Sequence, residues 1–525
     1  MTGESVSYRT KYLNTYFWQA LSIITGFLSL FVVVPYLSTN KVLFGVYSLC
    51  TSLTVFFSYA DLGFLNSARK FGAEYYIQGH LHREMKVIGF VTFMMLIVFS
   101  LLAIVIGFFA VYPKTLMPEL NIGSDESIVA SQLLILLAFS SIIIFCQRIL
   151  SVIYSIRVEE YKIQRLFIFG NLIKICSVFY FLTGGRYMIV EYYLFFQLVN
   201  LVVVIVALVG VRKYNYSIKE FISFIRFDKS VFKQTIGLSI ASLIAMIAMI
   251  LYYEIDQIAI SHLLGVETVA VYGIALTVLN LVRSYSSLIY SPYSARFNHF
   301  VGLGDEEGLQ NFVSKQIVVL TPLLLFPLLV ISLLSEPFIL SWVGSDYQES
   351  VSIVAIMVFS FAPGALQNPI SSYFYAKERS KELNIINIGY PMFYWAVIIM
   401  TYSFWGVNSF AISKVAAPSM AALAYLLIYK RMFVPAGQQV VNLKEIFIHI
   451  FIPAAICLAS CLFFKQFMFY EKSTLGLIMN AVVMVVCFVL TLITCVLVNN
   501  SLRTTVADYV NVIIKKNSNE KDFSR

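Results

Sequence analysis

The sequence predicts an all-α polytopic membrane protein, and three observations support this fold class. Of its 525 residues, 59% are hydrophobic and only 12% are charged, whereas about 25% are charged in a typical soluble domain. The mean hydropathy is +0.82. The apolar residues occur in long runs, and a helix that crosses a bilayer needs roughly 20 of them. A soluble core could not bury so much apolar surface, so we expect the chain in a membrane.

The apolar runs divide the chain into about 14 transmembrane helices. The first follows a short polar start and is too long for the apolar region of a cleavable signal peptide. The spans are expected near 12–37, 42–66, 87–112, 128–153, 164–183, 188–211, 235–263, 269–292, 316–339, 350–376, 384–405, 409–430, 446–469 and 474–499.

The distribution of basic residues predicts the orientation. The chain has 37 Lys and Arg residues and a net charge of +9. If the N-terminus is cytoplasmic, most of these residues fall in cytoplasmic loops, as the positive-inside rule requires. The bias persists along the chain, which predicts an even number of spans and two cytoplasmic termini. Topology therefore explains the charge, and no nucleic-acid partner is expected. The basic segments 67–86 and 212–234 are expected to lie on anionic membrane lipids.

The order of the loops predicts an internal repeat of six helices. A long cytoplasmic loop follows the second span (67–86) and the eighth span (293–315), and acidic outer loops follow the third and the ninth. The repeat offset is roughly 225 residues. We therefore expect two pseudo-symmetric six-helix bundles plus two C-terminal helices. The expected division is an N-terminal bundle 1–211, a basic linker 212–234, a C-terminal bundle 235–430, two additional helices 431–499 and a cytoplasmic tail 500–525.

Four cations lie within the predicted spans and are the candidate substrate-binding residues. They are Arg148, Lys174, Arg283 and Lys414. Charged residues at membrane depth are costly and usually face a protein-lined interior. Arg148 is close to the inner end of its span, so it could instead extend to the interface. Cations from both halves suit an anionic substrate bound between the bundles, because phosphate needs cationic donors.

Two carboxylates, Glu254 and Asp256, lie in the seventh span and have two possible roles. One of them could pair with Arg283 across the 234–292 hairpin and silence both charges. Alternatively, one could couple transport to an H⁺ or Na⁺ gradient. Residues two positions apart do not share a helix face, so a given partner is expected to contact only one of the two.

The sequence offers no catalytic or metal-binding constellation. Its seven Cys lie in apolar runs without metal-ligand spacing, its five His form no ligand pattern, and no phosphate-binding Walker motif occurs. We therefore expect a transporter rather than an enzyme, with no cofactor other than a coupling ion. A membrane polysaccharide polymerase is disfavoured because it would need a large outer loop, and the outer loop at 113–127 is short. A scaffold role is disfavoured by buried charges in both halves.

Three segments carry a resemblance to bacterial oligosaccharide flippases, the Wzx-type polysaccharide transporters. YYEIDQIAISHLLGVETVAVYGIA (252–275) resembles the junction between their seventh and eighth helices. SEPFILSWVGSDYQES (335–350) is similar to the outer segment before their tenth helix, and YADLGFLNSARKFGAEYYIQGHLHR (59–83) to the segment that closes their second. These motifs also mark the wider multidrug/oligosaccharidyl-lipid/polysaccharide exporter superfamily.

The resemblance implies a V-shaped pair of bundles in the bacterial cytoplasmic membrane. Such a protein would flip an undecaprenyl-diphosphate-linked oligosaccharide, an O-antigen, capsule or exopolysaccharide repeat unit, by ion-coupled alternating access. Its partners would be this glycolipid, membrane lipids and other polysaccharide assembly proteins. On this reading Tyr252, Tyr253, Tyr285, Tyr290 and Tyr293 are candidates for stacking on sugars, with helix packing as the alternative.

The two C-terminal helices favour the oligosaccharide or peptidoglycan-precursor branches over the twelve-helix drug exporters. An ion-coupled multidrug exporter remains the main alternative, and a peptidoglycan-precursor lipid flippase is a further one. An exporter of cationic drugs predicts an interior rich in carboxylates, whereas the cations in these spans are at least as numerous.

Overall fold

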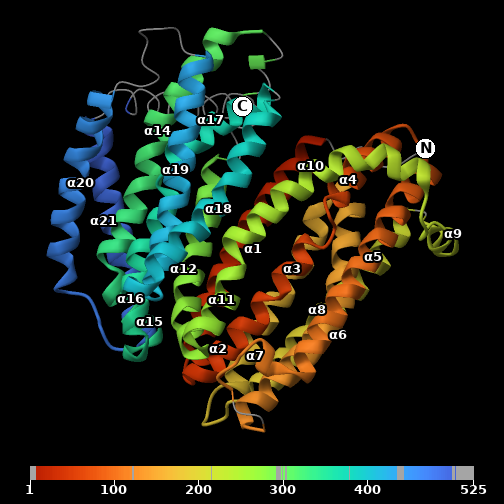
Figure 1. The fold of residues 1–525 in the computed structure, drawn as a ribbon, viewed down its shortest axis with the longest axis horizontal. Coiled ribbons are helices and arrows are strands. Elements are labelled where there is room, and N and C mark those ends of the chain that lie inside the picture. Colours follow the sequence, from red (N-terminus) through yellow and green to blue (C-terminus); the bar gives the residue numbers. More distant parts are fainter. Residues whose placement is uncertain are drawn as a thin grey trace, which may run out of the picture. The chain divides into compact units, whose positions relative to one another are not determined.

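The structure is a computed structural model that describes residues 8–120, 123–214, 216–290, 297, 300–301, 304–377, 379–433, 443–498 and 503. All regular secondary structure in these residues is helical (Figure 1). Twelve of the described helices are long and apolar enough to cross a membrane, and two shorter apolar helices cover Lys41–Phe57 and Ile450–Lys465. Together they account for the predicted spans and confirm the all-α polytopic fold class.

The chain forms two compact units, Met1–Gly273 and Ile274–Arg525. The boundary between them falls inside one continuous helix, α12 (Val266–Tyr290). This division reflects how the helices pack. The domain boundaries expected from the sequence were drawn from the six-helix repeat, and they stay a prediction.

The first unit consists of helices connected by short turns. α5 packs along α6, α6 and α7 pack against α8, and α1 packs against α7 (Figure 1). The helices are α1 (Tyr8–Leu37), α2 (Lys41–Ser52), α3 (Thr54–Tyr59), α4 (Phe64–Ile77), α5 (Leu81–Val111), α6 (Asp125–Ile156), α7 (Glu160–Phe181), α8 (Ile189–Val211), α9 (Ile218–Ser223), α10 (Lys229–Tyr253) and α11 (Ile255–Leu264), with 3₁₀ turns η1 (Pro113–Thr115) and η2 (Arg212–Tyr214).

The second unit begins with the rest of α12. Within it α18 packs along α19, α14 packs against α17, and α20 pairs with α21. The helices are α14 (Glu306–Leu333), α15 (Ser335–Val343), α16 (Gln348–Met357), α17 (Gly364–Ala376), α18 (Ser380–Trp405), α19 (Asn408–Phe433), α20 (Leu443–Lys465) and α21 (Thr474–Val498), with 3₁₀ turns η4 (Ser345–Tyr347) and η5 (Val358–Phe361).

Side-chain caps define where several helices begin. Asn40 Oδ1 accepts a hydrogen bond from the backbone N–H of Leu43 at 3.0 Å and starts α2. Asp228 Oδ1 accepts from the N–H groups of Ser230 and Val231 and starts α10. These caps satisfy N–H groups that have no partner within the helix.

The segment predicted as a single span at 42–66, followed by a loop at 67–86, is folded differently. The chain turns sharply at Leu62 (φ 49°) and Gly63 (φ 78°), which separate α3 from α4. α4 then continues to Ile77, and α5 begins at Leu81. The connection at 67–86 therefore contains a helix, α4, rather than an irregular loop. Its residues form a helix because an apolar face, which includes Ala68, is buried against the rest of the unit.

Prolines affect the helices of the second unit unequally. The span predicted at 350–376 is broken, because α16 passes into η5 and Pro363 precedes the start of α17. Pro322 and Pro327 lie inside α14, and Pro391 and Pro418 lie inside α18 and α19. A proline removes one backbone hydrogen bond, but a membrane helix tolerates this where neighbouring groups satisfy the freed carbonyl.

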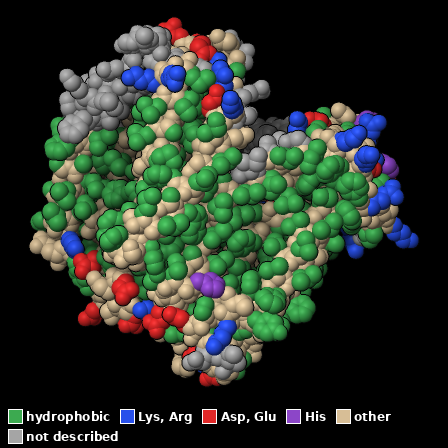
Figure 2. Space-filling view, viewed as in Figure 1, with side chains coloured by type: hydrophobic (Ala, Val, Ile, Leu, Met, Phe, Trp, Pro, Cys, Tyr) green, Lys and Arg blue, Asp and Glu red, His purple; other side chains and the backbone are tan. Residues whose placement is uncertain are grey.

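The outer surface is that of a membrane protein. Figure 2 shows hydrophobic side chains over the flanks of the helices in each unit and charged side chains near the helix ends. On α8, exposed Leu201, Val202 and Ile205 form such an apolar face. An apolar face of this kind is stable in lipid and would be unstable in water.

The last two helices are integral to the second unit. Asn480 of α21 is fully buried. Its Nδ2 donates to the carbonyl oxygens of Pro337 and Phe469 at 3.0 and 2.8 Å and to Ser341 Oγ at 2.9 Å, and its Oδ1 accepts from the N–H of Phe469 at 3.0 Å. Buried thiols, including Cys457 of α20, pack against α14 beside this network. The α20–α21 pair is thus held by apolar packing and by the hydrogen bonds of Asn480, which we call the Asn480 lock.

Candidate functional site

Lys174 occupies a buried polar site between α7 and α8, where it is 5% exposed. Its Nζ donates hydrogen bonds to Asn200 Oδ1 at 2.6 Å and to Asn171 Oδ1 at 3.4 Å. The same Nζ lies 3.8 Å from the ring centroid of Phe196. Asn200 in turn donates from Nδ2 to Gln197 Oε1 at 3.2 Å. Two amides and an aromatic face therefore surround the ammonium group.

The described partners of Lys174 are uncharged. Among the described residues no carboxylate forms an ion pair with it. Amide oxygens and ring faces stabilise a cation through dipoles and quadrupoles but do not cancel its charge. An anion that reached Nζ would form a charge-assisted hydrogen bond with little screening by water. The arrangement suits the predicted anion-binding role, which stays a prediction.

Arg148 lies half-buried on α6, close to two other charges. Asp61 attracts it and Arg69 repels it, but no ion pair joins Asp61 and Arg148 among the described residues. Asp61 is 4% exposed, and its Oδ2 accepts from the N–H of Leu65 at 3.3 Å. Asp61 is thus buried in the turn before α4.

Lys414 and Arg283, the other predicted cations, belong to the second unit. Lys414 on α19 is fully buried, and its Nζ lies 5.0 Å from the ring centroid of Tyr394 on α18. Arg283 is half-buried on α12. Lys174 and Arg148 belong to the first unit. A substrate site shared by all four cations, and a pairing of Arg283 with Glu254 or Asp256, therefore remain predictions.

Glu254 marks an interruption in the predicted seventh span. α10 ends at Tyr253 and α11 begins at Ile255, with Glu254 as the junction residue (φ −117°). Interrupted membrane helices leave backbone groups available at membrane depth, which is a recurrent feature of ion sites in transporters. Glu254 is half-buried. Its position at the break is compatible with the predicted ion-coupling role.

Asp256 has a different environment from Glu254. It is 1% exposed, and its Oδ2 accepts a short hydrogen bond from the hydroxyl of Tyr272, which is fully buried on α12. This bond closes the hairpin between α11 and α12. Asp256 thus has a structural partner, Tyr272, in addition to the pairing with Arg283 that was considered from the sequence.

The α11–α12 hairpin packs tightly on the rest of the first unit. Ser261 Oγ donates to the carbonyl oxygen of Leu116 at 2.9 Å. Gly265 (φ 83°) separates the two helices and lies against Glu119. A Cβ placed on Gly45 of α2 would lie 2.1 Å from the carbonyl oxygen of Val266. Ser261, Gly265 and Val266 of the 252–275 segment therefore have a packing role.

A buried ion pair that the sequence did not reveal lies at one end of the first unit. Arg157 Nη2 is 2.8 Å from Glu84 Oε1, and both side chains are at most 3% exposed. The guanidinium carbon lies 4.8, 4.6 and 5.1 Å from the ring centroids of Tyr76, Tyr214 and Tyr216.

Tyr216 completes this cluster by donating a hydrogen bond to Glu84 Oε1. Burial raises the pKa of the Tyr216 hydroxyl, so it remains a donor at neutral pH. The only sequence signal was Glu84 at the edge of an apolar run, and nothing in the sequence connected it to Arg157.

The tyrosines proposed for sugar stacking have structural partners. Tyr252 is 2% exposed, and its ring centroid is 4.5 Å from that of Tyr253. The Tyr285 hydroxyl donates to the carbonyl oxygen of Leu323 at 2.7 Å. Tyr290 is half-buried, and Tyr293 lies outside the described residues. For Tyr252 and Tyr285 these contacts are those of helix packing.

Comparisons with known sequences give two relationships. The MatE family matches residues 241–394. The uncharacterized membrane protein EpsK of Bacillus subtilis (strain 168) is 26% identical over 121 residues, which are 23% of this chain and 23% of EpsK. The match thus spans about a quarter of the curated relative's length.

Comparisons with solved structures extend over most of the chain. The lipid II flippase MurJ, in an inward closed conformation, matches with a TM-score of 0.63 at 14% identity, covering 92% of this chain and 97% of that one. An inward-facing multidrug resistance MATE family transporter of the MOP superfamily matches with a TM-score of 0.59 at 15% identity, covering 79% and 95%. Residues 241–394 thus match the MatE family, and the chain has the fold common to the MurJ flippase and the MATE transporters.

Proposed function

We propose that this chain is a transporter that flips an undecaprenyl-diphosphate-linked oligosaccharide across the bacterial cytoplasmic membrane by ion-coupled alternating access. The observation that carries the proposal is Lys174, a buried cation whose described partners are amides and an aromatic ring. A diphosphate is dianionic or more at neutral pH, so it gains from a cation that has no competing carboxylate. A cationic drug would be repelled.

The neighbours of Lys174 suit the sugar part of such a substrate. Asn171, Asn200 and Gln197 carry amide donors and acceptors, which match sugar hydroxyls and phosphate oxygens. In the free protein these amides hold the ammonium group in one place. On this proposal the phosphate takes over part of their role, so the site is ready before the substrate arrives.

The fold supports a lipid-linked substrate. The likeness to the lipid II flippase covers 92% of the chain, against 79% for the MATE transporter. The α20–α21 pair is locked into the second unit through Asn480, so it is part of the working fold rather than an appendage. We infer a large amphipathic substrate of the lipid-linked class, with O-antigen, capsule or exopolysaccharide repeat units as candidates.

A multidrug exporter is the second candidate, because the MatE family matches residues 241–394 and this segment contains the buried carboxylate Asp256. In that case Asp256 would exchange a cation for a drug, and Lys174 would be a structural residue. The two candidates differ in which of these two residues transport needs.

The test is complementation of a strain that lacks this chain. We would supply wild type, Lys174→Gln, Lys174→Arg or Lys114→Gln, confirm equal amounts in the membrane, and measure undecaprenyl-linked oligosaccharide on the cytoplasmic leaflet. The control Lys114 is exposed in η1. We expect accumulation without the protein and with Lys174→Gln, and relief by wild type, Lys174→Arg and Lys114→Gln. Unchanged glycolipid pools with altered drug sensitivity would overturn the proposal in favour of the exporter.

A further inference from the structure

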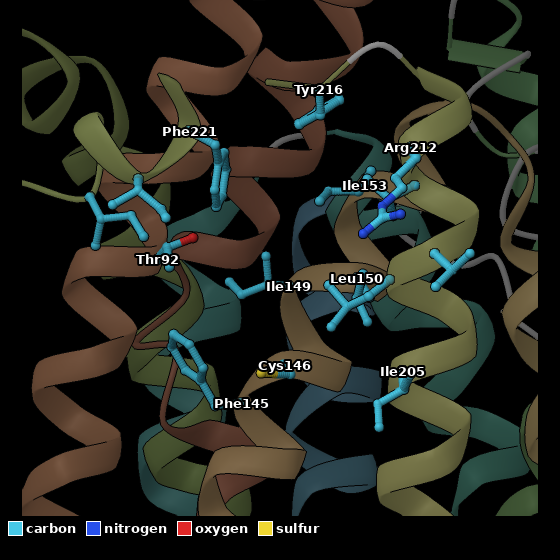
Figure 3. Close-up of a pocket in the computed structure, with 15 residues that line it drawn as sticks. Thr92, Phe145, Cys146, Ile149, Leu150, Ile153, Ile205, Arg212, Tyr216 and Phe221 are labelled. Carbon is cyan, nitrogen blue, oxygen red and sulfur yellow. The ribbon is translucent and has the colours of Figure 1, made fainter. Parts of the chain in front are cut away.

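A largely apolar cavity of about 540 Å³ lies within the first unit, between α5, α6, α8 and the segment that contains α9 (Figure 3). Phe145, Ile149 and Leu150 of α6 form one wall, and Ile205 of α8 forms another. Its volume falls within the about 300–1,000 Å³ typical of small-molecule sites. Because the lining is largely apolar, a membrane component is expected to fill the cavity.

The cavity opens on the lipid-facing side of α8. Ile205, Leu208 and Val209 line it and are 50%, 48% and 54% exposed. On the other side Ile222 of α9 lines it and is 59% exposed. A side chain that is both cavity-lining and exposed marks the opening. Acyl chains of the bilayer therefore have a direct lateral path into the cavity.

One end of the cavity carries an uncompensated cation. Arg212 follows the last residue of α8, and Figure 3 shows its side chain directed into the cavity, toward Leu150. The Arg212 side chain makes neither an ion pair nor a hydrogen bond with any residue that the structure describes. The neighbouring Tyr216 hydroxyl is already engaged with Glu84. A guanidinium group in this position can form two parallel hydrogen bonds to a phosphate.

We propose that this cavity binds one anionic phospholipid, with an acyl chain among the α6 and α8 side chains and its phosphate on Arg212. An apolar cavity with a cation at one end matches the chain-plus-phosphate layout of such a lipid. The site lies within the first unit and does not depend on the proposed transport function.

The test uses native mass spectrometry of the purified full chain in detergent, with dioleoylphosphatidylglycerol or dioleoylphosphatidylcholine added. We expect the anionic lipid to be retained preferentially by wild type. Arg212→Gln should reduce this retention about fivefold, and the matched control Lys213→Gln, one residue away and outside the cavity lining, should not. The melting temperature without added lipid should be the same for all three proteins, because the Arg212 side chain has no described partner to lose.

A second pair of variants tests the cavity itself. Ile205→Trp places a large ring at the opening and should reduce retention of both lipids, whereas Val202→Trp, on the same lipid-facing helix but outside the lining, should not. Equal retention of the two lipids by wild type, or no effect of Arg212→Gln, would overturn the proposal. Displacement of the phospholipid by an equimolar polyprenyl phosphate would instead assign the cavity to the isoprenoid chain, and would equally overturn it.

Discussion

The hydroxyl of Tyr272 donates a hydrogen bond to Asp256 Oδ2 across the α11–α12 hairpin, with both side chains at most 1% exposed. The two residues are 16 positions apart and lie on different helices. A buried carboxylate needs hydrogen-bond donors, and removal of a donor leaves the full desolvation cost of the acceptor. Asp256, a candidate ion-coupling residue, therefore also stabilises the hairpin through this bond.

We predict that Tyr272→Phe destabilises the protein by about 1–3 kcal/mol. Asp256→Asn should cost a similar amount, and the double variant should cost less than the sum, because both single changes break the same bond. Thermal unfolding in detergent measures each value. Tyr180→Phe, at an exposed tyrosine, serves as the control. Additive effects would show that the two side chains do not act together. A loss of ion dependence of transport in Asp256→Asn without a loss of stability would assign that residue to coupling.

Gly45 should tolerate no side chain. Its added Cβ would stand 2.1 Å from the carbonyl oxygen of Val266, and that oxygen belongs to a helix backbone that cannot rotate away. We expect Gly45→Ala to destabilise the protein by ~1–3 kcal/mol, as overpacking does. Gly107 has nothing within 4 Å of the same position, so Gly107→Ala should be neutral or slightly stabilising. Equal melting temperatures of the two variants in detergent would contradict the close approach of α2 and α12.

Asn480→Leu should loosen the α20–α21 pair. The substitution removes the partner of the Phe469 N–H and carbonyl groups at the buried Asn480, at a cost of about 1–3 kcal/mol for the groups left unpaired. Protease sensitivity of the connection 466–473, read by mass spectrometry of the fragments, should rise. Thr474→Ala, at an exposed residue of the same helix, should leave it unchanged. A resistant Asn480→Leu protein would show that apolar packing alone holds the pair.

Acid should weaken the contact between Asp228, the residue before α10, and Lys86 of α5. Hydrogen bonds, first from Lys86 and then from Ser230, hold the pKa of Asp228 well below its usual range. A depressed pKa contributes stability above the unfolded value of about 3.9, and this contribution is lost as the pH falls through the folded value. We expect the melting temperature in detergent to decrease from pH 5 to pH 3 in both proteins. The decrease should be smaller in Asp228→Asn than in wild type.

Glu74→Gln is the matched control for this titration, since Glu74 is an exposed carboxylate on α4, and it should follow the wild-type curve. At neutral pH, Asp228→Ala should cost ~0.5–2 kcal/mol through loss of the helix cap. Parallel pH curves for wild type and Asp228→Asn would contradict the contribution of Lys86, whose Nζ is 2.8 Å from Asp228 Oδ2.

Hydrophobicity alone was enough to predict most of the spans, because a span must provide about 20 apolar residues regardless of its partners. It could not predict the turn at Leu62–Gly63, since a positive φ at a leucine is imposed by the surrounding packing rather than by the local sequence. Lys174 was found because a mid-span cation is rare. Its partners on α8 were not found, because an amide in an apolar run does not reveal which helix it will face. The Arg157–Glu84 pair was missed for the same reason, since 73 residues separate its members.

The Asn480 lock has a consequence for biosynthesis. Its acceptors on α15, Pro337 and Ser341, are synthesised before it, and Asn480 follows Ser341 by 139 residues. Until α21 has been inserted, the backbone N–H of Phe469 lacks its Asn480 acceptor, and an unsatisfied group of this kind is costly in lipid. The nascent chain therefore exposes a polar site that only its own last helix satisfies.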